Sequence, residues 1–202
     1  MRAFLAIELS ESVKESLGRL IRQLQRTGAD IRWVKTVNLH LTLEFFGEVP
    51  PGTVERIDEA MRTVAARVSS FTVRLGETGA FPNERRPRVF WLGISEGRQN
   101  VCALRETIHG VLSVAGIAGD DKPFEPHITL GRVCSSRGTE EALAVLHTVP
   151  QEEFGATRVE RVTLFRSDLR PEGAVHTPVR EFAWRTGRKF ALHQTEEGQE
   201  HV

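Results

Sequence analysis

A short pattern, His-x-Thr followed by Leu, occurs twice in this chain of 202 residues and restricts the folds that the chain can adopt. The first copy contains His40 and Thr42, and the second contains His127 and Thr129. Side chains alternate between the two faces of a β-strand, so each copy presents its histidine and threonine on one face. Two such strands predict a fold in which both polar faces line a single site.

The apolar residues between these polar ones predict which face of each strand is buried. In the second copy, Ile128 and Leu130 are expected in the core. In the first copy, strict alternation places Glu44 beside His40 and Thr42 and buries the other set, which is Leu39, Leu41, Leu43 and Phe45.

Hydrophobic periodicity along the rest of the chain predicts an α+β protein. Helices are expected at 11–26, 53–68, 99–115 and 139–147, and strands at 2–9, 31–34, 39–47, 71–75, 89–94, 126–132, 157–165 and 175–184. Residues 76–88 are expected to form a loop. The order of these elements indicates two lobes of antiparallel-rich sheet with outer helices, and the repeated motif indicates an internal duplication. We expect one bilobal domain over 1–184 and a flexible, polar C-terminal tail over 185–202.

The charge balance limits the kind of partner. Lys plus Arg equals Asp plus Glu, whereas proteins that coat nucleic acid are usually basic. Any contact with nucleic acid is therefore expected to be local, at an end or a short strand. Two isolated cysteines, Cys102 and Cys134, are typical of a reducing compartment, and neither a signal peptide nor a transmembrane segment is visible. These features predict a cytoplasmic protein without a membrane partner.

Two histidines that flank one reacting atom suit displacement at a phosphodiester. The attack needs a base on the incoming oxygen and an acid on the leaving oxygen, on opposite sides of the phosphorus. Histidine ordinarily titrates near pH 6.5, so one ring can be neutral while the other is protonated. The threonine hydroxyls can hold the non-bridging oxygens. This chemistry requires no metal and no cofactor.

Other kinds of site are less compatible with the sequence. The chain has no Gly-x-Ser-x-Gly elbow, P-loop, Gly-x-Gly-x-x-Gly fingerprint or His-Glu-x-x-His motif. The two motif histidines with Glu44 remain an alternative metal site, although only one carboxylate is evident. The remaining histidines lie outside any motif and are expected on helices or at the surface; they are His109, His147, His176, His193 and His201.

The motifs and the blocks around them resemble the two-histidine phosphoesterases, and within these the RNA 2′,3′-cyclic phosphodiesterases, also called 2′-5′ RNA ligase-like proteins. The resemblance covers most of residues 1–184. Besides both motifs, it is carried by residues 2–7, 32–34, 38–47, 86–91, 126–132 and 164–173.

This resemblance implies a pseudo-symmetric central cleft and the hydrolysis of a terminal 2′,3′-cyclic phosphate to a 2′-phosphomonoester. His40 would donate a proton to the leaving 3′ oxygen, and His127 would accept one from water. Thr42, Thr129 and Arg132 would bind the phosphate; Phe4 would stack a base. The expected partners are RNA ends or nucleoside 2′,3′-cyclic phosphates, with the protein acting as a monomer.

Three positions complicate the comparison with the family. Strict alternation puts Arg132 on the buried face, so it reaches the cleft only if the strand bends at Gly131. Glu44 stands where relatives often have a basic residue, and His176 where an aromatic residue is frequent. Two alternatives to hydrolysis stay open: ATP-independent 2′-5′ joining of RNA ends through the same groups, and a non-catalytic module that binds nucleotides or RNA ends.

Overall fold

The computed structural model describes residues 1–120, 122–150, 154–171 and 173–184, so the predicted tail lies outside the described residues. None of the helices in these ranges is both long and apolar enough to cross a membrane. In chain order the elements are β1 (Arg2–Glu8), α1 (Glu11–Gln25), β2 (Ile31–Trp33), the 3-10 turn η1 (Thr36–Asn38), β3 (His40–Glu48), α2 (Thr53–Ala65), β4 (Phe71–Phe81), β5 (Val89–Glu96), α3 (Arg98–Val114), β6 (Ile128–Val133), α4 (Thr139–Thr148), β7 (Ala156–Val159), β8 (Arg161–Arg170) and β9 (Gly173–Ala183).

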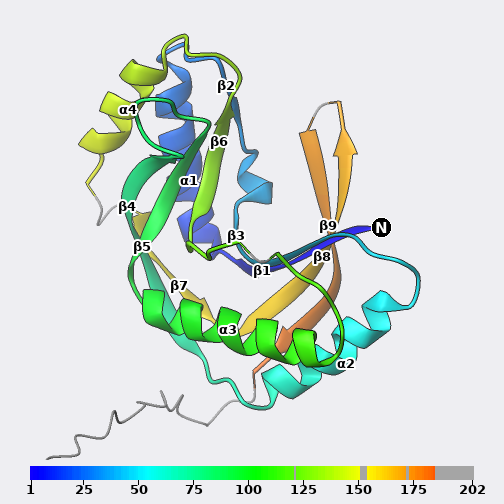
Figure 1. Ribbon diagram of the computed structural model, residues 1–202. Helices are drawn as coiled ribbons and strands as arrows, with labels where there is room; N and C mark the ends of the chain where they lie inside the picture. The colour runs from blue at the N-terminus through cyan, green and yellow to red at the C-terminus, as the bar shows by residue number, and fades with distance from the viewer. Residues whose placement is uncertain (121, 151–153, 172, 185–202) are drawn as a thin grey trace, which may run out of the picture.

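The strands form one curled sheet in the order β7-β4-β5-β6-β3-β1-β8-β9, and every pairing is antiparallel. The short strand β2 pairs with the part of β6 that β3 does not reach. The two central strands, β3 and β6, are registered only at Leu41 and Ile128. The sheet therefore divides there into two walls, and each wall takes strands from both halves of the chain. Figure 1 shows α1 and α4 together beside one wall, with α2 and α3 together beneath the sheet. The predicted α+β architecture with antiparallel sheet and outer helices is confirmed.

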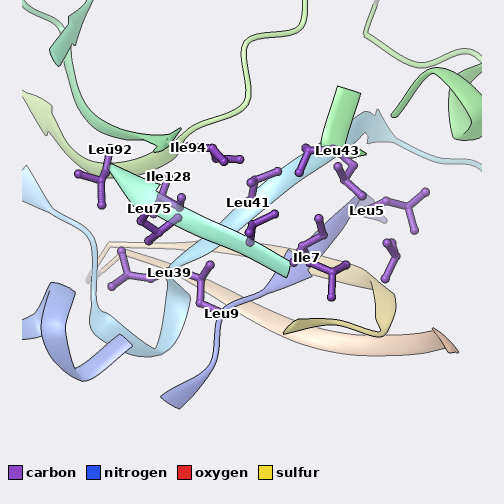
Figure 2. Close-up of a cluster of buried hydrophobic side chains, with 14 of the residues drawn as sticks. Leu5, Ile7, Leu9, Leu39, Leu41, Leu43, Leu75, Leu92, Ile94 and Ile128 are labelled. Atoms are coloured by element: carbon purple, nitrogen blue, oxygen red, sulfur yellow. The ribbon is translucent and has the colours of Figure 1, made fainter. Parts of the chain in front are cut away.

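The main core lies between the helices and the sheet. Figure 2 shows that β1 and β3 contribute alternate residues to it, among them Leu5, Ile7 and Leu41. Ile128 of β6 joins the same cluster, so the apolar faces of both motif strands are buried together. Burial of each such side chain contributes about 1.5–3 kcal/mol to stability. The opposite faces of these strands are thereby directed into the space between the two walls.

Two segments differ from the prediction. Residues 76–81, expected to be part of a loop, continue β4, because Gly79 leaves the room that the Trp91 indole occupies across the strand; a Cβ on Gly79 would lie 2.7 Å from the Trp91 ring. The single strand expected over 157–165 is two strands, with β7 on β4 and β8 on β1. The break at Glu160 lets the chain pass from one wall to the other.

Candidate active site

The register of the two central strands brings both motifs together. Leu41 pairs with Ile128 in antiparallel orientation. Counting one residue outward on each side sets His40 opposite Thr129 and Thr42 opposite His127. The two histidines are then diagonal to each other: their positions are offset by about 7 Å along the strand direction and by about 5 Å from one strand to the next. Each histidine thus faces the threonine of the other motif, and both rings can approach a group held between them.

These four side chains line a cavity of about 730 Å³ between the two walls of the sheet. The wall formed by β2, η1 and β6 contributes one side, and the β8–β9 hairpin contributes the other. Residues from segments far apart in the sequence therefore surround one space; they are Arg2, Phe4, Arg32, Trp33, Val34, Lys35, Asn38, His40, Thr42, Phe45, His127, Thr129, Arg132, Ser167, Leu169, Arg170, Gly173, Ala174 and His176.

Both motif histidines are fixed by the same backbone contact. Nδ1 of His40 lies 2.7 Å from the carbonyl oxygen of Asn38, and Nδ1 of His127 lies 2.7 Å from that of Glu125. A carbonyl oxygen can only accept, so Nδ1 carries a proton in each ring. Nε2 is then the nitrogen of each ring that is left to gain or lose a proton. In His40 this atom is 3.0 Å from Oγ1 of Thr42, whose hydroxyl donates to the neutral ring.

His40 lies in an aromatic environment. Its ring stacks on Phe4 with 4.8 Å between ring centroids, and Phe165 is close on the same face of the sheet. The pKa of His40 is lowered to about 4, chiefly by burial. The hydrogen bond to the Asn38 carbonyl raises the pKa in part, and the nearby His176 and His127 rings lower it further. His40 is therefore neutral at pH 7 while the cleft holds no anion.

His127 lies on the other wall and is supported differently. The edge of its ring packs against Phe81 at 4.9 Å between centroids, and Phe81 in turn stacks on Trp91. The aromatic pair thus orients His127 as Phe4 and Phe165 orient His40.

The predicted position of Glu44 is wrong, because a β-bulge reverses the alternation of β3. Leu5 pairs with Glu44 and the next residue of β1, Ala6, pairs with Thr42, so Leu43 is an extra residue on β3. Beyond Leu43, Phe45 faces the cavity, and Glu44 lies on the opposite face of the sheet.

Glu44 is 2% exposed and has its own partners on that opposite face. It pairs with Arg105 and His109 of α3 and accepts a hydrogen bond from the backbone N–H of Asp120. The alternative metal site that joins Glu44 to the motif histidines is therefore excluded by geometry. Within the described ranges, no group of three or more His, Cys, Asp and Glu residues could hold a metal ion.

A second bulge explains how Arg132 reaches the cleft. Phe90 of β5 pairs with Gly131 and Trp91 pairs with Thr129, which leaves Leu130 as the extra residue of β6. The alternation is thereby reset, and Arg132 lines the same cavity as Thr129. The bend occurs one residue before the expected Gly131. Gly131 is still required there, since a Cβ on it would lie 2.6 Å from Ile31 and 2.8 Å from Trp33.

The base-stacking role expected for Phe4 is not supported by its surroundings. Phe4 is 3% exposed, and its ring packs against His40, Phe165 and His176. Little of the ring is left for a nucleobase. Phe4 instead forms the aromatic floor on which His40 rests.

The cavity carries a strong local positive charge although the whole chain is neutral. No aspartate or glutamate occurs among its described lining residues. None of its basic side chains forms an ion pair with another described residue; these are Arg2, Arg32, Lys35, Arg132 and Arg170. Three arginines between β4 and β5 are not among the lining residues; they are Arg85, Arg86 and Arg88. The cleft can therefore bind an anion through several unneutralised cations.

The sequence interpretation missed the basic residues Arg2, Arg32, Lys35 and Arg170 of the cavity, and it also missed His176 of β9. Its ring lies 5.3 Å from that of His40, edge to face, and it lines the cavity. No motif marks it. The signal that could have found it is the turn-forming sequence Pro171-Glu172-Gly173 between two predicted strands, since the pairing of β8 with β9 sets His176 opposite Ser167 at the level of the cleft.

The chain is similar to known proteins over most of its length. The family described as LigT like Phosphoesterase matches twice, over residues 7–91 and 92–176, which agrees with the internal duplication expected from the repeated motif. An RNA 2′,3′-cyclic phosphodiesterase of Methanothermobacter thermautotrophicus is 32% identical over 182 residues, which cover 90% of this chain and 98% of that protein.

Solved structures agree with these matches. A crystal structure of a Thermus thermophilus protein has a TM-score of 0.75 and 32% identity, covering 92% of this chain and 98% of that one. Escherichia coli LigT, crystallised with 3′-AMP, has a TM-score of 0.68 and 26% identity, covering 91% of this chain and 97% of that one.

Proposed function

The chain belongs to the LigT-like phosphoesterase family and is an RNA 2′,3′-cyclic phosphodiesterase, and from this premise we propose that His40 and His127 are its acid and base. One observation carries the proposal. Two histidines with Nδ1 held by a carbonyl direct their reactive nitrogens into a basic cavity lined by no described carboxylate. Such a cavity binds the phosphate anion, and the two rings then lie on opposite sides of the phosphorus.

The phosphate is held by Thr42, Thr129 and Arg132. The threonine hydroxyls flank the centre of the diagonal between the histidines, where they donate to non-bridging oxygens. The Arg132 guanidinium neutralises the charge that these oxygens gain in the transition state, as a planar donor with several N–H groups is suited to do.

His127 activates the attacking water. Its neutral Nε2 takes a proton as the water oxygen bonds to phosphorus. The Glu125 carbonyl, which accepts from Nδ1, stabilises the resulting imidazolium. Arg132 and the hydroxyls hold the phosphate in line for this attack.

His40 protonates the leaving group. As the bond between phosphorus and the 3′ oxygen breaks, the Nε2 proton of the His40 imidazolium passes to that oxygen, and the product is a 2′-phosphomonoester. In the cleft without ligand, burial against Phe4 disfavours this imidazolium and lowers the pKa of His40 to about 4. The negative charge of the bound phosphate is what allows His40 to hold a proton beforehand.

The substrates are RNA ends or nucleoside 2′,3′-cyclic phosphates. The E. coli relative crystallised with 3′-AMP supports a site that takes a single nucleotide. The additional unpaired cations, such as Arg2 and Arg170 on the hairpin side, suit an RNA chain with further phosphates.

The test is hydrolysis of a short RNA that ends in a 2′,3′-cyclic phosphate, in excess chelator, with the product identified by ³¹P NMR. We expect turnover with a 2′-phosphate as the only monoester. A 3′-phosphate would reverse the leaving oxygen and the orientation between His40 and His127. Tight binding without turnover would replace hydrolysis by an end-binding function, and loss of activity with chelator would overturn the metal-free scheme.

A further inference from the structure

His176 offers a third ring nitrogen to the cleft, beside the proposed acid. Its ring lies edge to face against both His40 and Phe4, with centroid distances of 5.3 and 4.9 Å. β9 also holds a fixed position relative to His40, because the Asn38 side-chain amide donates to the carbonyl of Ala174 at 2.7 Å while the Asn38 carbonyl accepts from His40. His176 is therefore a built part of the site.

The two nitrogens of His176 are in different surroundings. Nδ1 is buried and has no hydrogen-bond partner among the described residues. A neutral imidazole carries one N–H, which is more favourable on the nitrogen that water or a ligand can reach than on a buried nitrogen without an acceptor, so the proton of the neutral ring belongs on Nε2. Nε2 is not among the buried unpaired atoms, and the residue lines the cavity, which leaves this N–H available to a ligand there.

We propose that His176 binds the substrate directly, its Nε2–H donating a hydrogen bond to a sugar or phosphate oxygen of the terminal nucleotide on the His40 side of the phosphorus. This inference rests on the proposed function, because the ribose lies on the side of the leaving 3′ oxygen only if His40 is the acid.

A neutral donor suits this position better than a cation would. Burial lowers the pKa of His176, which favours the uncharged ring. A positive charge 5.3 Å from His40 would oppose the protonation that the acid requires. His176 can thus strengthen binding of the nucleotide without weakening its neighbour as an acid.

Three substitutions of His176 distinguish the contribution of its N–H donor from that of its aromatic ring. His176→Phe keeps an aromatic ring without nitrogen, His176→Gln places an amide N–H near the position of Nε2, and His176→Asn places one near Nδ1. A hydrogen bond to a charged oxygen corresponds to about a tenfold to hundredfold effect. We expect kcat/KM to fall by this factor for Phe and Asn and to stay within about threefold of wild type for Gln. His147→Phe, on α4 outside the cleft, is the matched control and should leave kcat/KM unchanged.

Binding of adenosine 2′-monophosphate, measured by calorimetry in chelator, gives a readout that does not need turnover. The dissociation constant should rise for Phe and Asn and recover for Gln, at equal Tm. The proposal is overturned if the Phe variant matches wild type, if Gln is no better than Phe, or if each loss follows a drop in Tm. A wild-type protein that binds without turnover would overturn the proposed function instead, and the binding series would still decide the role of His176.

Discussion

The protonation of His40 gives a quantitative prediction, because the empty cleft and the occupied cleft should differ sharply. Burial holds the pKa of His40 at about 4 in the empty cleft. A single negative charge 4 Å away stabilises the imidazolium by roughly 4 kcal/mol at an effective dielectric constant of 20, or about three pKa units. Binding of a phosphate-like anion should therefore return the pKa of His40 to the neutral range.

Sulfate is a suitable probe, since its charge does not change between pH 3 and 8. The ring signals of His40, identified by their loss in His40→Gln, can be titrated by NMR with and without sulfate. We expect a midpoint near pH 4 without sulfate and an increase of at least two units with it. Sulfate affinity should increase as the pH falls from the higher midpoint toward the lower one, and this dependence should be much weaker in His40→Gln. The same midpoint with and without sulfate would refute the reasoning, as would a midpoint near pH 6.5 in the absence of sulfate.

Three further predictions concern activity and stability. His40→Ala and His127→Ala should each lower kcat by about 10²–10⁴-fold with an unchanged circular dichroism spectrum, and near-full activity in either would remove the two-histidine scheme. Arg132→Gln should lower kcat/KM by about tenfold to a hundredfold, whereas the control Arg85→Gln, outside the cleft, should not. Glu44→Gln leaves Arg105 without its buried carboxylate and should lower the unfolding free energy by roughly 3 kcal/mol, measured by urea denaturation, and a loss below 1 kcal/mol would contradict that role.

The sequence predicted the parts of the site that depend on strand alternation over a few residues. His40 and Thr42, and likewise His127 and Thr129, share a face because no irregularity separates them. The prediction failed where a bulge intervenes. The extra residue Leu43 turns Glu44 away from the cleft, and bulges depend on how two strands pair, which a single strand's pattern does not contain.

The same limit applies to residues brought in by distant segments. His176 enters the site because β9 returns along β8, and a lone histidine in a strand carries no motif. Phe4 does line the cleft, but its ring is part of a buried aromatic floor, since Phe165 of β8 and His176 of β9 pack against it. The curling of the sheet, which makes the cleft, arises from the pairing of strands across the whole chain.

The most direct test of the acid–base assignment is a one-atom change in the substrate. Sulfur in place of the bridging 3′ oxygen leaves as a thiolate, which needs no proton. We expect His40→Ala to hydrolyse this cyclic phosphorothiolate at a rate within about tenfold of wild type, while His127→Ala stays as impaired as on the natural substrate. Recovery by His127→Ala and not by His40→Ala would contradict the account and exchange the two roles.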